Sequence, residues 1–566
     1  MEKRMILALV LTAAVVGLTP VIFPPAPVPT GRADSTAVAP ATRDARVAPP
    51  AAVQPVPATA PIVPVVDSLA ALPPSISADS TVVATDLATY RFVDVGAAPV
   101  SLVINRYGNL ARRGTPVDLG ATGAPLLRYR LVVPGDTVDL SRVKFGRTSA
   151  GAPGVGSPLQ YSATVNGHVV TIGYSFAPDS YLLGVTGRVD SPGGATGPRF
   201  LLVDLPTSFP VTEADSVGDR RSLAYAFKSE RESSKSVSFS SLDPGEHRLE
   251  ATPLTWVAAK SKYFVVGVLT PEGDDPFSEA TFTGGPRTSR DATNAVATVV
   301  ERVGDEGFAF ELYAGPQEWD RMLKVGREFD SVNPYGWKFM QGFVQPFARI
   351  VMRILLWMHN VLQLSYGWVL VIFGVVVRLI LWPLNQKAMK SSLRMQHIQP
   401  RMQEVQKKYA GNREKQQAEM MKIYKEEGVS PFSAVTGCLP MLLPMPVLIA
   451  LFFVFQNTIE FRGVPFLWLT DISIKDPYYI LPVLMGASMY VLSWIGLRNA
   501  PPNPQAKMMS YIFPFMMTFF LMNLAAGLNL YYAVQNIAAL PQQWLIARER
   551  QKMAAKSVRS EKRASS

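Results

Sequence analysis

Long uncharged stretches mark the membrane segments in the second half of the chain. No Asp, Glu, Lys or Arg occurs between residues 427 and 460, 476 and 498, or 507 and 548. A helix that crosses a bilayer needs about 20 apolar residues. The first two stretches therefore predict one helix each, near 434–456 and 477–497. The third is long enough for two helices, with a break near 523–529.

Two further apolar segments complete the pattern. Residues 361–384 predict a crossing in which Arg378 is the only charged residue. Residues 5–23 are apolar and follow Lys3 and Arg4. This run is longer than the apolar core of a signal peptide, about 7–15 residues, and it leads into Pro24 and Pro25. We therefore favour an uncleaved anchor at 1–23 over a cleaved signal sequence, which gives six transmembrane helices.

The region after the anchor is predicted to be a linker and then a β domain. Residues 24–82 are rich in Pro and Ala, which indicates an extended spacer. Between 83 and 320, apolar and polar residues alternate in short segments, most clearly at 89–93, 127–132, 161–165 and 169–174. Asn166-Gly167 joins the last two segments and is a strong signal for a type I′ hairpin. The pattern predicts an antiparallel β-sandwich.

The distribution of charge predicts the orientation. Residues 385–430 and the tail 547–566 together carry ten of the eleven net positive charges. These segments, with Lys3, Arg4, Arg498 and Lys507, fall on one side if all six helices cross. Because short basic loops stay in the cytoplasm, both termini are expected there and the β domain outside. The fold class is a multi-pass α-helical membrane protein with a large external antiparallel β-sandwich.

Residues 385–430 are predicted to form a cytoplasmic hairpin of two helices. Apolar side chains recur with heptad spacing up to Tyr409, and Gly411-Asn412 then ends the first helix. Pro400 predicts a kink or a late start in that helix. The hairpin is either a plain solvated structure or a docking surface. A docking surface would use Met402, Tyr409, Met420 and Tyr424.

Arg378 is the candidate for function inside the membrane. Its side chain either extends to the nearby headgroups or faces a water-filled cavity. The last crossing carries Asn529, Tyr532 and Asn536 at spacings of three and four residues, with Gln535 beside them. The crossings contain no Asp or Glu, which argues against an ion pump. An arginine among uncharged polar groups predicts a hydrophilic pocket that attracts anionic groups.

The sequence contains no sign of an enzyme. Cys438 is the only cysteine, and the four histidines form no HExxH motif. We expect no catalytic residues, no metal site and no cofactor. Two other classes stay open: a transporter or channel, and a membrane-anchored protein that binds or processes sugars with its β domain.

Several motifs resemble, in the same order, those of the YidC/Oxa/Alb family of membrane protein insertases. They are Arg378–Leu384, Met395–Pro400, Gly437–Pro446, Asp476–Gly486 and Gly527–Tyr532. The β region is similar to the periplasmic domain of the long Gram-negative form. The resemblance implies a core of five helices at 335–546 with a groove that is open to cytoplasm and lipid and contains Arg378. It also implies a location in the bacterial inner membrane.

The function implied by this resemblance is insertion and folding of inner-membrane proteins without ATP, alone or with the Sec translocon. The expected partners are nascent membrane proteins, the Sec translocon, membrane lipids and a ribosome. The basic tail, with Arg548, Arg550 and Lys552, is expected to attract ribosomal phosphates together with the hairpin. Ordinary positive-inside anchoring is the alternative role of the tail.

Two positions depart from the family pattern. Gly374 stands where bacterial members often carry a hydroxyl residue, one turn before the arginine. Pro444 stands where Gln is common. We expect both differences to alter the contacts of the groove.

Overall fold

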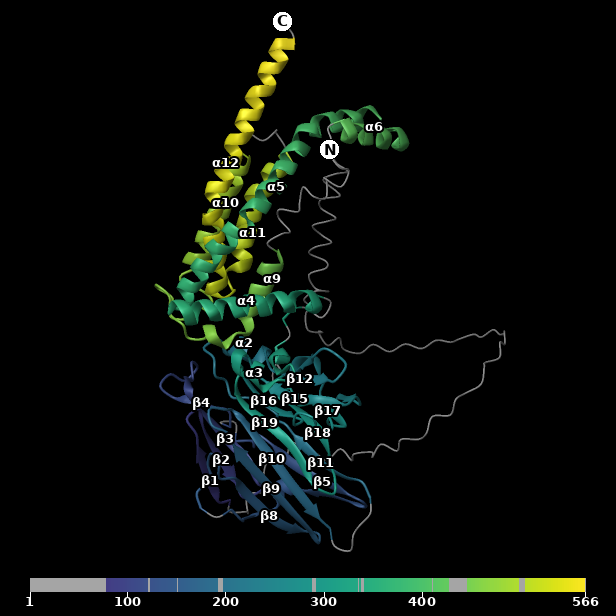
Figure 1. The fold of residues 1–566 in the computed structure, drawn as a ribbon, viewed down its shortest axis with the longest axis vertical. Coiled ribbons are helices and arrows are strands. Elements are labelled where there is room, and N and C mark those ends of the chain that lie inside the picture. Colours follow the sequence, from purple (N-terminus) through teal and green to yellow (C-terminus); the bar gives the residue numbers. More distant parts are fainter. Residues whose placement is uncertain are drawn as a thin grey trace, which may run out of the picture. The chain divides into compact units, whose positions relative to one another are not determined.

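The computed structural model describes residues 78–120, 123–149, 151–191, 197–287, 292–333, 335–336, 340–409, 411–426, 445–497 and 504–564 (Figure 1). The predicted anchor, most of the predicted linker, Cys438 and Pro444 lie outside these ranges.

The β domain contains three antiparallel sheets in the described residues. The first sheet has the order β1 (Ser80–Ala84), β2 (Ala88–Val93), β3 (Ala98–Gly108), β4 (Pro116–Asp118). The second has the order β13 (Lys235–Ser238), β12 (Ala224–Ser229), β15 (Leu254–Lys260), β16 (Phe264–Leu269), β19 (Phe308–Pro316), β10 (Leu182–Asp190), β9 (His168–Phe176), β8 (Leu159–Val165), β7 (Gly146–Arg147). The third has the order β14 (His247–Glu250), β17 (Glu279–Gly284), β18 (Ala295–Val303), β11 (Arg199–Asp204), β5 (Arg128–Val133), β6 (Asp136–Asp139).

The predicted antiparallel pairing is confirmed. β8 and β9 form a hairpin in which Val165 pairs with His168. Asn166 and Gly167 between them both have positive φ, at 48° and 83°, as a type I′ turn requires. The first strand begins at Ser80, so β structure starts inside the segment that the sequence assigned to the linker.

One hydrophobic core joins the three sheets. Tyr225 of β12 and Phe282 of β17 lie with their ring centres 5.6 Å apart, which connects the second sheet to the third. The Tyr129 and Tyr174 hydroxyls, 2.8 Å apart, make a second connection between these sheets. Short helices lie between the strands and after β19: η1 (Leu140–Arg142), α2 (Ser216–Arg221), η3 (Phe239–Ser241), α3 (Trp319–Val325) and η4 (Phe329–Val332).

The rest of the described chain is helical. Its elements are α4 (Gln341–Leu362), α5 (Tyr366–Lys408), α6 (Arg413–Glu426), α9 (Met445–Asn457), η5 (Ile459–Phe461), α10 (Ile480–Leu497), α11 (Pro504–Leu521) and α12 (Ala526–Ala564). α12 packs against α5 and α10, α11 packs against α10, and α4 packs against α9. In Figure 1, α4 runs across the direction of α5 and α12.

Two of the described helices are long and apolar enough to cross a membrane, at 366–386 and 480–497. Shorter apolar segments occupy 447–457 in α9 and 510–521 in α11. These four overlap predicted crossings, and the break between α11 and α12 falls at 522–525, close to its predicted place.

The crossing predicted at 361–384 begins later than expected. The left-handed Gln363, with φ of 54°, ends α4 after Leu362, and α5 starts at Tyr366. α4 was not predicted from the sequence. Its buried side includes Val344, Ala348 and Leu355, whereas Phe343, Ile350, Trp357 and Val361 are exposed.

α5 is a single helix of 43 residues that continues through Pro383 and Pro400. Of the two effects predicted for Pro400, the late start of the first hairpin helix is wrong, because that helix is the continuation of the membrane segment. The kink stays a prediction. A proline removes one backbone donor, a local cost that the surrounding helix outweighs. α12 likewise continues through Pro541 into the basic tail.

Candidate functional site

Arg378 projects from α5 toward α12. One terminal amino group of its guanidinium donates a hydrogen bond to Gln542 Oε1, at 3.0 Å. Gln542 is almost fully buried, and its Nε2 donates to the Trp382 carbonyl oxygen at 3.0 Å. An uncharged amide is thus the partner that the structure gives to the arginine.

A second polar contact joins the same helices one turn away. Gln535 Nε2 donates to the Gly374 carbonyl oxygen at 2.9 Å and to the Tyr531 hydroxyl at 3.0 Å. Gly374 is buried, and a Cβ at this position would lie 3.0 Å from Val534 Cγ1. A side chain at Gly374 would therefore meet α12.

The other polar residues predicted for the pocket contact different helices. Asn529 is buried and donates to the Leu521 carbonyl oxygen at the end of α11, at 3.0 Å. Asn536 donates to Ser488 Oγ of α10, at 3.2 Å. Tyr532 is half-buried beside Tyr531, with ring centres 6.2 Å apart. The structure therefore brings Gln535 and Gly374 close to Arg378 but directs Asn529 and Asn536 toward α11 and α10.

Several buried polar atoms of α5 have no hydrogen-bond partner among the described residues. They include Arg378 Nε, Asn385 Nδ2 and Gln386 Oε1. Arg378 and Asn385 are seven residues apart, so they lie on one face of the helix. Because buried donors are normally paired, these two positions have hydrogen-bonding capacity for another molecule.

Gln542 and Asn385 were missed in the sequence analysis. Gln542 follows Gln535 by seven residues, so both amides point to the same side of α12. That spacing was the available signal. Asn385 was assigned to the hairpin, since α5 was expected to end its membrane part at Pro383.

The hairpin buries part of its predicted docking surface within itself. Ile398, Ile423 and Tyr424 form a small core, with Met402 and Val405 packed against it. Tyr409 and Met420 are half-buried, and Met421 is exposed. These apolar contacts thus hold α5 and α6 together. For Met402 and Tyr424 this favours a structural role inside a plain hairpin over a role in docking.

The basic end of α12 is exposed where its side chains are described. The Arg548 guanidinium lies 3.5 Å from the centre of the Trp544 ring, and Lys552 is exposed. The side chain of Arg550 lies outside the described part. The tail therefore begins as a helix with charges directed to solvent.

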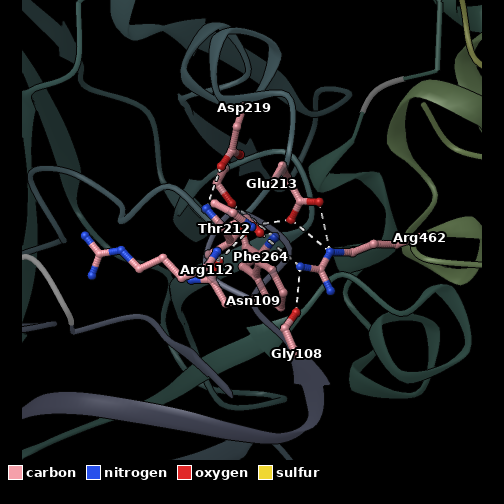
Figure 2. Close-up of polar contacts among 10 residues, drawn as sticks. Gly108, Asn109, Arg112, Thr212, Glu213, Asp219, Phe264 and Arg462 are labelled. Atoms are coloured by element: carbon pink, nitrogen blue, oxygen red, sulfur yellow. Dashed lines mark hydrogen bonds and ion pairs between the residues drawn. The ribbon is translucent and has the colours of Figure 1, made fainter. Parts of the chain in front are cut away.

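An arginine of the helical part is buried in the β domain. Arg462 follows η5, and its Nε donates to both carboxylate oxygens of Glu213 at 2.8 and 3.0 Å (Figure 2). Its terminal amino group donates to the carbonyl oxygens of Gly108 and Thr212. The guanidinium carbon lies 5.4 Å from the centre of the Phe264 ring. Both side chains of the ion pair are at most 5% exposed. No local sequence pattern indicated this contact.

Glu460 lies two residues before Arg462 and makes a second contact. Its Oε1 accepts a hydrogen bond from the Trp319 backbone amide at 2.9 Å, and its Oε2 has no partner in the described residues. Burial, with smaller contributions from the nearby Glu318 and Asp320, raises the pKa of Glu460 to about 7. This carboxyl group therefore titrates near neutral pH.

The β domain has a cleft of about 1010 Å³ that bears on the sugar-binding alternative. Its lining includes Asp274, Asp275 and Glu301, and burial raises the pKa of Glu301 to about 8. Phe277 and Phe308 also line it, but both are buried in the domain core. The cleft thus offers carboxylates, but neither of these two phenylalanine rings is exposed. Sugar sites usually present the face of an aromatic ring, so the cleft gives little support to the sugar-binding alternative.

Two family models match the chain. The model described as "60Kd inner membrane protein" matches residues 357–554, and the model described as "YidC periplasmic domain" matches residues 80–349. Residues 350–356, inside α4, separate the two matches.

Curated relatives agree with these matches, and one solved structure is similar at low identity. A "Membrane protein insertase YidC" of Anaeromyxobacter dehalogenans is 36% identical over 53% of this chain, and the chain spans about half of that relative, 52%. The protein of the same name from Chlorobium phaeovibrioides is 30% identical over 82% of this chain and 79% of its own length.

The solved structure is titled "Active YidC insertase crystal structure with the first transmembrane domain resolved". It is 17% identical to this chain and has a TM-score of 0.32, with coverage of 83% of this chain and 93% of its own. The relatives are named insertases, and an insertase is not an enzyme. From the family models and the relative that is similar over most of its length, the chain belongs to the YidC family of inner-membrane protein insertases, in the long form with a periplasmic domain.

Proposed function

We propose that the chain receives nascent membrane helices at Arg378 and releases them into lipid without a nucleotide. Membership of the insertase family makes membrane proteins its substrates. The observation that carries the route is the environment of Arg378: its described partner is the neutral Gln542, and its Nε is unpaired. The positive charge is therefore available to an acidic segment of a substrate.

The energetics of this route require no fuel. A polar tail must pass a layer of low dielectric constant, and a polar cavity in the cytoplasmic leaflet makes that layer thinner. Arg378 attracts the acidic tail for a short time. The apolar part of the substrate then leaves along the lipid-facing side chains of α9 and α11, and its transfer into lipid supplies the free energy.

The arrangement in the membrane is part of the proposal. Six crossings are proposed: the anchor at 1–23, and five in the core at 335–546. Both termini, the hairpin 385–430 and the tail 547–566 would be cytoplasmic, with the β domain at 83–320 in the periplasm after the linker 24–82. The Lys/Arg distribution supports this orientation.

Sec translocon, ribosome and lipids are the proposed partners beyond the substrates. The exposed Arg548 and Lys552 support attraction to ribosomal phosphates or to anionic lipids. On the hairpin, Met421 is the exposed apolar residue that supports a contact, whereas Met402 and Tyr424 have partners inside the hairpin.

The test uses substrates that differ only in the charge of the translocated tail. Arg378→Lys keeps the charge and should retain insertion of both substrates. Arg378→Ala should impair the acidic-tail substrate and spare the substrate with a neutralised tail. Protease protection of the tail, in cells that carry only the variant, measures the outcome. Normal insertion of the acidic tail by Arg378→Ala would refute the role of this charge.

A transporter or channel gives a different result. In a channel, loss of Arg378 would change ion or solute flux and would leave tail protection unchanged. The same variants in vesicles, with a flux assay, therefore separate the two classes.

A further inference from the structure

The contacts of Gln542 require an amide side chain at this position. Its two polar atoms face partners of opposite kind, because Arg378 can only donate and the Trp382 carbonyl can only accept. A primary amide satisfies both partners at once. A carboxylate would suit the arginine but would place a negatively charged oxygen against the carbonyl of Trp382.

The neutrality of Gln542 has an electrostatic consequence. An amide holds the guanidinium in place and leaves its net charge intact, whereas a carboxylate at the same distance would form an ion pair with it. A guanidinium has five N–H donors, so others besides the one on Gln542 serve a substrate. Among them, Arg378 Nε is buried and unpaired in the described residues.

We infer that Gln542 is a positioning residue that fixes Arg378 for acidic segments of the substrate and keeps its charge uncompensated. This inference rests on the proposed function and names the residue that sets the selectivity of the site for charge. A substrate carboxylate binds the free donors of Arg378 while Gln542 holds the opposite side of the guanidinium. The preference for acidic tails thus depends on an uncharged residue of α12.

Three variants of the full chain, reconstituted in lipid vesicles, test the inference. Gln542→Glu adds a competing charge, and Gln542→Leu removes the amide with little change of volume. Gln543→Glu is the matched control, since it adds a carboxylate one position further along α12, where Gln543 lies close to Gly496 of α10. Each variant is assayed by protease protection with an acidic-tail substrate and with its neutral-tail counterpart.

Gln542→Glu should lower insertion of the acidic tail by about tenfold. This factor corresponds to the free energy of a typical hydrogen bond to a charged group. Gln542→Leu should lower it by about threefold, because the charge persists but is no longer held. Gln543→Glu should stay near wild type. Insertion of the neutral tail should be unchanged in all three, which a purely structural role of Gln542 would not produce.

Two results would overturn the inference. Equal loss of both substrates in the Gln542 variants would reduce the residue to a packing role. Equal behaviour of Gln542→Glu and Gln543→Glu with the acidic tail would show that Arg378 does not sense its partner. In both cases insertion of the neutral tail by the wild type would leave the proposed function standing. If the wild type inserted neither substrate beyond empty vesicles, the proposed function would fall together with the inference.

Discussion

Ile459 and Trp319 each lie in the hydrophobic core of the other part of the molecule. Ile459, directly after α9, is 1% exposed and belongs to the core of the β domain. Trp319, after the last strand, is 4% exposed and belongs to the core of the helices. Two polar contacts lie beside these residues: the ion pair of Arg462 with Glu213, and the hydrogen bond of Glu460 with Trp319. The periplasmic domain and the C-terminal end of α9 are therefore joined by shared hydrophobic cores and by a buried ion pair.

The buried ion pair at this junction predicts an asymmetry between single and double variants. Arg462→Met leaves the Glu213 carboxylate buried without its partner and should cost about 3–5 kcal/mol of unfolding free energy. The double variant Arg462→Met with Glu213→Gln should recover much of that loss, because neither charge remains. Thermal unfolding in detergent measures both. An additive effect of the two substitutions would contradict the pairing.

Glu460 predicts a pH dependence of stability with a defined sign. Its pKa in the folded protein, about 7, is above the ordinary value of 4.5, so the folded state favours the protonated form. Its contribution is therefore most favourable below about pH 4.5 and is lost as the pH rises toward 7. Glu460→Gln should raise the unfolding temperature at pH 8 relative to the wild type and change it little at pH 4.5. An equal difference at both pH values would rule out titration of Glu460 as the cause.

Gly374 predicts a steric effect on the packing of α5 against α12. In Gly374→Ser the new Cβ would lie 3.0 Å from Val534 Cγ1, so the Val534 side chain must move by a few tenths of an ångström, at a cost of about 1 kcal/mol. Adding Val534→Ala should restore stability by providing space. Gly342→Ser in α4 is the matched control, since its Cβ would meet no atom within 4 Å. Unfolding temperatures that fall equally for both serine variants would contradict the packing argument.

The proposed orientation predicts the faces from which two sites are accessible. Ser240 and Gln417 are both exposed, the first in the β domain and the second in the hairpin. In a Cys438→Ser background, a cysteine at either position should react with a membrane-impermeant thiol reagent from one face only, and the two faces should differ. Labelling of both from the same face would invalidate the topology.

The tail predicts salt-dependent association with ribosomes. Truncation after Ala547 removes seven Lys/Arg and two acidic residues, so co-sedimentation with ribosomes should decrease, most clearly at low salt. Changing Arg548, Arg550 and Lys552 to Gln keeps the length of α12 and should reproduce part of the decrease. Association that is unchanged and insensitive to salt would leave the tail with an anchoring role only.

The β ladders were predictable because their signals are local. Alternation at 161–165 and 169–174 places one face of each strand in the core, and Asn166-Gly167 can adopt the positive φ of the turn. The break between α11 and α12 was predictable for a similar reason, since a 40-residue uncharged stretch cannot be one crossing. In these cases residues close in sequence determine the structure.

The parts that were missed depend on partners distant in sequence. Arg378 and Gln542 are 164 residues apart, and Arg462 and Glu213 are 249 apart, so no spacing rule connects them. Whether Tyr424 belongs to a docking surface or to the inside of the hairpin stayed open because the direction of a hairpin helix is set by its partner, here Ile398 and Met402. α4 is a different case, since Val344, Ala348, Val351 and Leu355 are buried at helical spacing and the signal for an amphipathic helix was present in the sequence but was not used.

The continuity of α5 connects the membrane segment to the hairpin through one helix. At about 1.5 Å per residue, its 43 residues follow a helical path of about 65 Å. Arg378 and Met402 lie about 36 Å apart along this path. Because no loop separates them, a change in the direction of the hairpin is a change in the same helix that carries the guanidinium.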